Sequence, residues 1–175
     1  MQYLWAPWRM AYIRGERQRS EGCIFCAKAA RLNDDAEHVI AHSQHTYVTL
    51  NRYPYNTGHL LVVPFAHVES QEHLETDALT DLMVMTNRAL TVLRRLYNPP
   101  AFNLGANLGP AAGAGIADHY HFHIVPRWPG DANFMSVVGE TRVLPDTLDN
   151  SFHDLKRVWQ ETFGENRSEK NYDNR

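Results

Sequence analysis

The feature that most restricts the fold of this chain is the run HYHFHIV at residues 119–125, in which histidines alternate with apolar residues. Successive side chains of a β-strand point to opposite faces, so His119, His121 and His123 would share one face, roughly 6 to 7 Å apart. The apolar residues between them would be buried on the other face. A helix would scatter the same side chains around its circumference. The run therefore predicts a strand that directs three titratable rings toward one place.

The chain length limits the domain organisation. With 175 residues and 43% hydrophobic content, the chain is long enough for one well-buried core and too short for two ordinary domains. The N-terminal segment contains Trp5, Trp8 and Tyr12. This aromatic surface is large enough to dock on the rest of the domain or on a partner chain. We therefore expect a docking segment over residues 1–22, a single domain over 23–163 and a disordered polar tail over 164–175.

Charge and hydropathy exclude several classes of partner. The net charge of −3 gives no general attraction for nucleic acid or for acidic membranes, so neither is expected as a partner. No apolar stretch approaches the roughly 18 residues of a membrane helix. The N-terminus also lacks the apolar core and small-residue cleavage site of a signal peptide. These observations indicate a cytoplasmic protein, in which the two cysteines would stay reduced.

Hydrophobic periodicity predicts the remaining elements. A short turn leads into a helix after Cys23, and the segments expected to be strands are residues 38–51, 58–65 and 101–109, the last running into a loop. A long helix is expected over 76–97, capped by Thr76 or Asp77 and ended by the sequence NPP. One apolar face of this helix is formed by Leu79, Leu82, Met83, Thr86, Ala89, Leu90, Leu93 and Leu96.

A last helix is expected over about residues 151–163. Strands on both sides of one central helix, without strand–helix alternation, indicate an α+β domain with an antiparallel sheet.

The alternating histidines are open to three interpretations: a surface cluster, a metal-binding stripe or a catalytic group. The small, glycine-rich loop at residues 109–115 precedes them. Backbone N–H groups of such a loop can approach a phosphate closely, although a flexible turn is the commoner role. A histidine nucleophile beside such donors supplies the two parts that phosphoryl transfer needs.

The run HYHFHIV resembles the signature of the histidine triad (HIT) proteins, which are nucleotide hydrolases and transferases. The resemblance extends from LNRYPYNTGHLLVVPFAH at 50–67, through FNLGANLGPAAG, to HYHFHIVPRWPGDANF at 119–134. These motifs are most similar to the diadenosine tetraphosphate phosphorylase branch, also called ATP adenylyltransferases. The resemblance implies a HIT-like fold, which is a five-stranded antiparallel sheet with one long helix and a C-terminal helix, and a homodimer.

The resemblance also implies roles for individual histidines. His121, the middle residue of the triad, would attack the α-phosphorus and form a nucleotidyl-histidine intermediate. His123 would orient and polarise the site near the α-phosphate. His59 would join this cluster from a neighbouring strand.

Two asparagines match positions that contact the nucleotide in the family. Asn51 would bind the ribose hydroxyls and Asn107 would lie beside the phosphates, although Asn is also common at strand ends and turns for conformational reasons alone. Gly113 and Gly115 of the loop would offer backbone donors. Many family members carry Gly-Gln-Ser or Gly-Gln-Thr before the triad, whereas this chain has Gly113-Ala114-Gly115-Ile116. The missing amide and hydroxyl leave the leaving-group chemistry of the simpler hydrolases in question.

Cys23 and Cys26 form a C-x-x-C motif with three possible roles: a redox pair, two unrelated buried cysteines or half of a structural zinc site. The sequence before Cys23 does not supply the strand that a thioredoxin-like pair requires. Zinc needs two more ligands, and the histidines in range from spacing alone are His38, His42, His45, His67 and His73. The resemblance implies a structural zinc ion held by Cys23, Cys26, His67 and His119.

The reaction predicted from these residues is cleavage of a dinucleoside polyphosphate, with diadenosine tetraphosphate favoured, at the α-phosphorus. Phosphate is the favoured acceptor, and Mg²⁺ is a candidate companion of the polyphosphate. A hydrolase that uses water to cleave nucleotide phosphates or phosphoramidates remains the alternative. A nucleotide-binding protein without catalysis is the third possibility, because a fold alone does not determine a substrate.

Overall fold

The computed structural model describes residues 22–131 and 147–164. Most of the expected docking segment (1–22), the tail (164–175) and the end of the GDANF motif lie outside these residues. The described part is a five-stranded antiparallel sheet with helices, so the predicted α+β architecture is confirmed. None of the described helices is both long and apolar enough to cross a membrane.

The strands follow the order β1-β2-β3-β5-β4 across the sheet. Their bounds are Val39–His42 for β1, Thr46–Leu50 for β2, Leu60–Pro64 for β3, Ala101–Gly105 for β4 and Phe122–Arg127 for β5. The histidine-rich strand β5 therefore lies inside the sheet, between β3 and β4, and its neighbours on both sides can contribute side chains to the same site.

The segment 38–51, expected to be one strand, is a hairpin formed by β1 and β2. Its turn is closed by the backbone N–H of Ser43, which donates to the carbonyl of Thr46 over 2.8 Å. Asp81 of the long helix accepts a hydrogen bond from the backbone N–H of His45 and another from the Thr46 hydroxyl, each 3.1 Å long. The carboxylate of Asp81 thus stabilises the turn between β1 and β2, which the sequence of the segment does not indicate by itself.

The long helix α3 spans Thr76–Tyr97, as the periodicity predicts. It ends where Asn98 adopts a left-handed conformation with φ of 44°. The predicted cap is wrong, because the N-cap is Glu75 and its side chain makes no capping hydrogen bond. The predicted apolar face is partly wrong as well: Leu79 and Met83 are exposed. The buried side chains are Ala78, Leu82, Met85, Thr86, Ala89, Val92 and Leu93.

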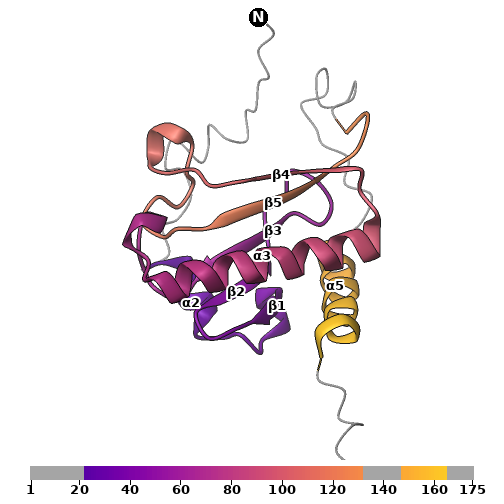
Figure 1. Ribbon diagram of the computed structural model, residues 1–175, viewed down its shortest axis with the longest axis horizontal. Coiled ribbons are helices and arrows are strands. Elements are labelled where there is room, and N and C mark those ends of the chain that lie inside the picture. Colours follow the sequence, from indigo (N-terminus) through magenta and orange to yellow (C-terminus); the bar gives the residue numbers. More distant parts are fainter. Residues whose placement is uncertain (1–21, 132–146, 165–175) are drawn as a thin grey trace, which may run out of the picture.

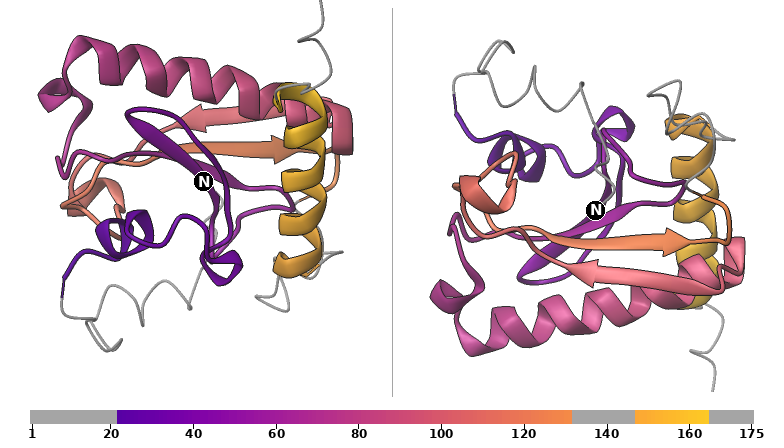
Figure 2. Two further views of the ribbon diagram at one scale, coloured as in Figure 1. Left: turned by 90° about the horizontal axis from the view of Figure 1, so that it is seen from below. Right: turned by 90° about the horizontal axis from the view of Figure 1, so that it is seen from above.

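Two hydrophobic clusters lie on opposite faces of the sheet. The larger one joins α3 and the C-terminal helix α5 (Leu148–Phe163) to side chains from four strands. The smaller one includes Phe25 of the short helix α2 (Ile24–Ala29), with Tyr47, Leu61 and Val63 from the sheet. Figure 1 shows α3 lying across the strands with α5 near its C-terminal half, and Figure 2 shows α2 on the side of the sheet opposite to α3.

Candidate active site and metal site

The alternation of the histidine run is preserved in the fold. Tyr120 and Ile124 are buried in the cluster beneath α3, whereas the histidines face α2 on the other side. His119 and His121 precede the first residue of β5, so only His123 lies within the hydrogen-bonded strand. The chain nevertheless stays extended enough to bring the three rings into one row, with His121 and His123 centroids 5.0 Å apart. The prediction of one shared face is therefore correct, although the strand is shorter than expected.

His121 is held in one tautomer by the backbone carbonyl of His119. Its Nδ1 lies 2.9 Å from the carbonyl oxygen of His119. A carbonyl only accepts, so Nδ1 carries the hydrogen and the Nε2 of a neutral ring keeps its lone pair. Burial lowers the pKa of His121 below its ordinary value, and Phe25 packs against the ring at 4.9 Å between centroids. His121 is thus expected to be a neutral imidazole near pH 7, with the lone pair on Nε2.

His59 and His123 form a hydrogen-bonded pair. The Nε2 of His59 lies 2.9 Å from the Nδ1 of His123, and His59 is completely buried. The backbone N–H of Tyr55 donates to the Nδ1 of His59 over 3.0 Å, so this nitrogen must act as an acceptor. In the neutral pair, His59 therefore donates from Nε2 to Nδ1 of His123, and the hydrogen of His123 sits on its Nε2.

Asn51 lies at the end of β2, beside this pair. Its side-chain oxygen accepts from the backbone N–H of Tyr53 over 3.0 Å, and its amide nitrogen lies 3.4 Å from the Nδ1 of His59. Asn51 and His59 thus lie side by side. The contacts also orient the Asn51 side chain before any ligand arrives.

The loop between β4 and β5 approaches the histidines through strand pairing. Gly105 is the register partner of His123, and Asn107 follows two residues later, half-buried. Gly113 and Gly115 lie further along the loop and are exposed. The N–H of Gly113, at a φ of 84°, donates to the carbonyl of Pro110 over 2.9 Å and closes a turn. That amide is already engaged within the loop.

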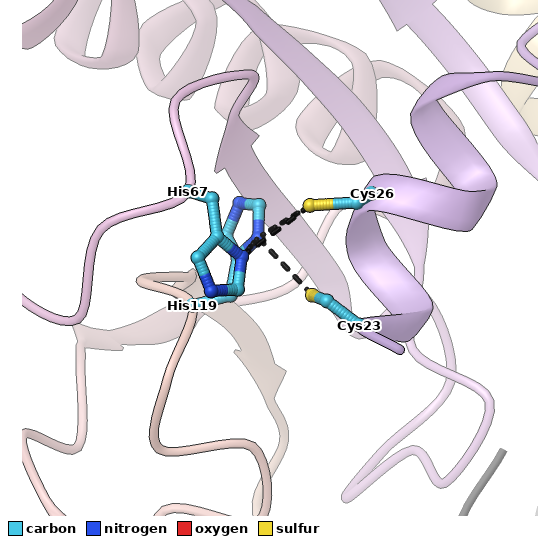
Figure 3. A group of neighbouring side chains, drawn as sticks. All are labelled: Cys23, Cys26, His67 and His119. Carbon is cyan, nitrogen blue, oxygen red and sulfur yellow. Dashed lines mark hydrogen bonds between the residues drawn. The ribbon is translucent and has the colours of Figure 1, made fainter. Parts of the chain in front are cut away.

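The four predicted metal ligands converge on one point (Figure 3). Cys23 and Cys26 come from the start of α2, His67 follows β3, and His119 precedes β5. Their donor atoms all lie within 4.8 Å of one another. The Nδ1 atoms of the two histidines are 3.2 Å apart, and each faces a cysteine Sγ at 3.3 Å.

These distances fit a tetrahedral metal ion. With Zn–N of about 2.0 Å and Zn–S of about 2.3 Å, tetrahedral donors lie roughly 3.3 to 3.8 Å apart. The Nε2 of His119 is 2.9 Å from the carbonyl of Pro64, to which it donates, so its Nδ1 presents a lone pair to the ion. Burial lowers the pKa of His119, which also keeps the ring neutral, as a metal ligand must be. The group can therefore hold a metal ion.

The other histidines considered from spacing alone lie outside this group. His38 instead pairs with Asp149 of α5 at 2.8 Å, and His73 is exposed in a short 3-10 helix. No spacing rule separates them from His67 and His119, because the selection depends on which loops meet α2.

Two contacts of the site were not expected from the sequence. One is the Tyr55 amide at His59, and the other is a hydrogen bond from Asn56 to Asp131 at 2.7 Å. Turn residues such as Asn, Pro and Gly marked the segment as a reversal, but gave no sign of its contact with a residue 75 positions away.

Comparison with known proteins identifies the family. The HIT domain model matches residues 33–130. The AP-4-A phosphorylase of Mycobacterium tuberculosis is 37% identical over 165 residues, which cover 91% of this chain and 85% of that protein. Protein hit of Bacillus subtilis is 29% identical over 124 residues, covering 67% of this chain and 79% of that protein.

A solved structure supports the same fold. The crystal structure of a Zn-bound histidine triad family protein from Mycobacterium smegmatis is similar with a TM-score of 0.64 at 23% identity, covering 81% of this chain and 95% of that one. The chain therefore belongs to the HIT domain family, as its motifs predict. Membership in this family, together with the phosphorylase relative, supports a nucleotide-processing enzyme.

Proposed function

We propose that this enzyme cleaves a dinucleoside polyphosphate, with diadenosine tetraphosphate as the favoured substrate, and transfers the nucleotidyl group to phosphate. The observation that carries the proposal is the neutral His121 ring, whose Nδ1 bonds to the His119 carbonyl and whose Nε2 keeps a lone pair. The AP-4-A phosphorylase relative, at 37% identity, supports the choice of substrate and acceptor.

In the first step, Nε2 of His121 attacks the α-phosphorus. A P–N bond forms, the P–O bond to the remaining phosphates breaks, and ATP leaves when the substrate is diadenosine tetraphosphate. The nucleotidyl-imidazolium carries a positive charge, which the carbonyl of His119 stabilises at Nδ1. In the second step, an oxygen of inorganic phosphate attacks the same phosphorus and displaces His121, which yields ADP.

His123 and His59 would stabilise the charge that develops on the phosphate oxygens. In the neutral pair, the Nε2 of His123 carries a hydrogen that can be donated to an oxygen of the α-phosphate. The bond from His59 fixes this orientation before substrate binds, so no rotation is needed in the transition state.

The remaining contacts to the nucleotide are proposed from the same resemblance. Asn51 would bind the ribose hydroxyls, and Asn107 would lie beside the phosphates. Gly115 is a better phosphate donor than Gly113, since the Gly113 amide bonds within its turn.

We propose zinc as the ion of the cysteine–histidine group, because thiolate and imidazole ligands suit it and because a Zn-bound family member shares the fold. A closed set of four protein ligands makes the ion structural. His119 would then hold the strand on which His121 depends and would not shuttle protons.

A homodimer is proposed from the surface of the described residues. β4 is an edge strand, and Leu104 on it is exposed, as are Leu79 and Met83 on α3. An unpaired edge strand and exposed apolar side chains both favour pairing with a second copy. Cysteines that act as thiolate ligands fit a reducing compartment, so we also propose a cytoplasmic location.

The decisive experiment is turnover of diadenosine tetraphosphate with and without inorganic phosphate, followed by chromatographic separation of the products. A phosphorylase yields ADP together with ATP, and its rate rises with phosphate concentration. Release of AMP and ATP independent of phosphate identifies a hydrolase. Binding without turnover under both conditions identifies a nucleotide-binding protein and contradicts the proposal.

A further inference from the structure

The turn between β2 and β3 is folded around His59. The backbone N–H of His59 donates to the carbonyl of Asn56 over 3.1 Å, and that of Asn51 donates to the carbonyl of His59 over 2.9 Å. The Tyr55 N–H donates to the Nδ1 of the His59 ring. The Asn51 amide nitrogen lies 3.4 Å from the same Nδ1, so the shorter bond from Tyr55 makes the position of this turn the main determinant of which His59 nitrogen accepts a hydrogen bond.

The side chain of Asn56 connects this turn to the far end of β5. Its amide nitrogen lies 2.9 Å from the carbonyl of Pro126 and 2.7 Å from the Oδ2 of Asp131. Both partners are acceptors, so the amide must donate to each, and its orientation is determined. The two contacts span 70 and 75 residues of sequence, so they join separate parts of the fold.

Asp131 is built as a fixed acceptor. Its carboxylate accepts hydrogen bonds from Nε of Arg127 at 2.6 Å and from Nη2 of the same guanidinium at 2.9 Å. It also accepts one from the backbone N–H of Trp128 at 3.3 Å. The hydrogen bonds from Arg127, then that from Asn56, hold the pKa of Asp131 well below its usual value. The carboxylate thus remains charged, and a charged acceptor makes a stronger hydrogen bond with Asn56 than a neutral one.

A continuous set of contacts therefore leads from Asp131 to the histidine pair. Asp131 and Pro126 hold Asn56, Asn56 neighbours Tyr55 in the turn, and the Tyr55 amide selects Nδ1 of His59 as the acceptor. If the turn moved away, only the longer contact from the Asn51 amide nitrogen, at 3.4 Å, would remain on Nδ1, and neutral His59 could then place its hydrogen on that nitrogen. His59 would then no longer donate to His123.

We propose that Asp131 is a positioning residue for the reaction: through Asn56, it holds the turn whose Tyr55 amide fixes the tautomer of the His59–His123 pair. This inference rests on the proposed function, since it concerns the donor that His123 offers to the phosphate. Asp131 would act on the two rings through Asn56 and the turn.

Arg127 supplies a matched control. It pairs with Asp131 and also donates to the side chain of Asn103 over 2.7 Å. Its Nε and the Asn56 amide both donate to Oδ2 of Asp131, so the two residues are neighbours on this carboxylate and each makes its own bond to it. The variant Arg127→Gln removes the ion pair, but Asp131 remains ionised at neutral pH even at its ordinary pKa of 3.8, so its hydrogen bonds from Asn56 and from the Trp128 N–H remain available. It therefore separates loss of local stability from loss of the connection to the turn.

The test combines kinetics with nuclear magnetic resonance of the full chain. In Asp131→Ala and Asn56→Ala, kcat should fall on the order of tenfold to a hundredfold, as for a small displacement of a catalytic group, with KM changed far less. The double variant should lose no more than either single one, because both act through one contact. Arg127→Gln should keep kcat near the wild-type value.

The ¹⁵N signals of the His59 ring give a readout that a merely structural role would not change. The wild-type ring should show a protonated Nε2 and an unprotonated Nδ1, and both alanine variants should show tautomer averaging. Unchanged ring signals in these folded variants, or an equal loss of kcat in Arg127→Gln, would overturn the inference. Because the ring signals are read without substrate, absence of turnover by the wild-type protein counts against the proposed function alone.

Discussion

Loss of the metal ion is expected to destabilise the protein strongly, because the ion would link parts of the chain that are far apart in sequence. Cys23 and His119 are 96 residues apart, and Cys26 and His67 are 41 apart. Closing a loop of about 100 residues restricts the unfolded chain by about 4.7 kcal/mol in the loop-entropy model. This is a large share of the roughly 5 to 15 kcal/mol by which domains are stable.

The corresponding change in melting temperature is measurable. For a chain of this size, about 1 kcal/mol shifts Tm by about 2 to 4 °C, so complete loss of the ion should lower Tm by roughly 10 to 20 °C. Chelation and the variant Cys26→Ser should both produce such a decrease. Thermal unfolding followed by circular dichroism measures it, with the metal content determined by mass spectrometry on protein purified without chelator.

His73→Ala is the control for this experiment, since His73 is an exposed histidine outside the group of four. It should leave metal content and Tm unchanged. Nucleotide affinity, measured by calorimetry, should fall less than stability in Cys26→Ser, because the site is closed by protein ligands. Purified protein without metal, or a Tm insensitive to chelation, would refute the reasoning.

Three further predictions follow from individual residues. His121→Ala should lower turnover by a factor on the order of 10⁴ or more while nucleotide binding and Tm are largely retained, which steady-state kinetics and calorimetry can establish. Gly58→Ala should lower Tm, because Gly58 has φ of +74° and a Cβ there would lie 2.9 Å from the ring of Tyr97. For Asp131, whose pKa is lowered chiefly by Arg127, the stabilisation should be present above its ordinary pKa of 3.8 and lost as pH falls below that value. The difference in urea unfolding between wild type and Asp131→Asn should therefore stay constant from pH 7 to about 5 and shrink below pH 4.

Much of the fold follows from periodicity in the sequence. The helix over Thr76–Tyr97 and the alternation around His121 were predicted with the correct period, since both depend on which side chains a regular backbone places on one face. The period does not define where a stripe begins. Leu79 and Met83 lie beside the buried stripe, and packing against the sheet and α5 buries Met85 and Val92 instead.

The hairpin of β1 and β2 shows a different limit. Val39, Ile40 and the run Thr46–Thr49 favour extended structure, and residues 43–45 between them contain no Gly, Pro, Asn or Asp, so the sequence predicts a single strand across the turn. The turn is stabilised by Asp81, which accepts hydrogen bonds from it and belongs to α3, more than thirty residues further along the chain. Local propensity contains no information about such a partner.

For the histidine site and the metal site as well, the sequence determined some features and the tertiary structure determined others. The sequence alone determined which chemical groups were available to the two sites. The C-x-x-C pair supplies thiols that suit a metal ion, and the three alternating histidines direct their imidazole rings to one face. Which histidines meet the cysteines was decided only by the tertiary structure, because the loop after β3 and the residues before β5 converge on α2. Likewise, Asp131 lies close to Asn56 because β5 pairs with β3 in the folded sheet. The physical reason is that ligand geometry and hydrogen bonding act over a few ångströms in space, whereas these partners lie tens of residues apart along the chain.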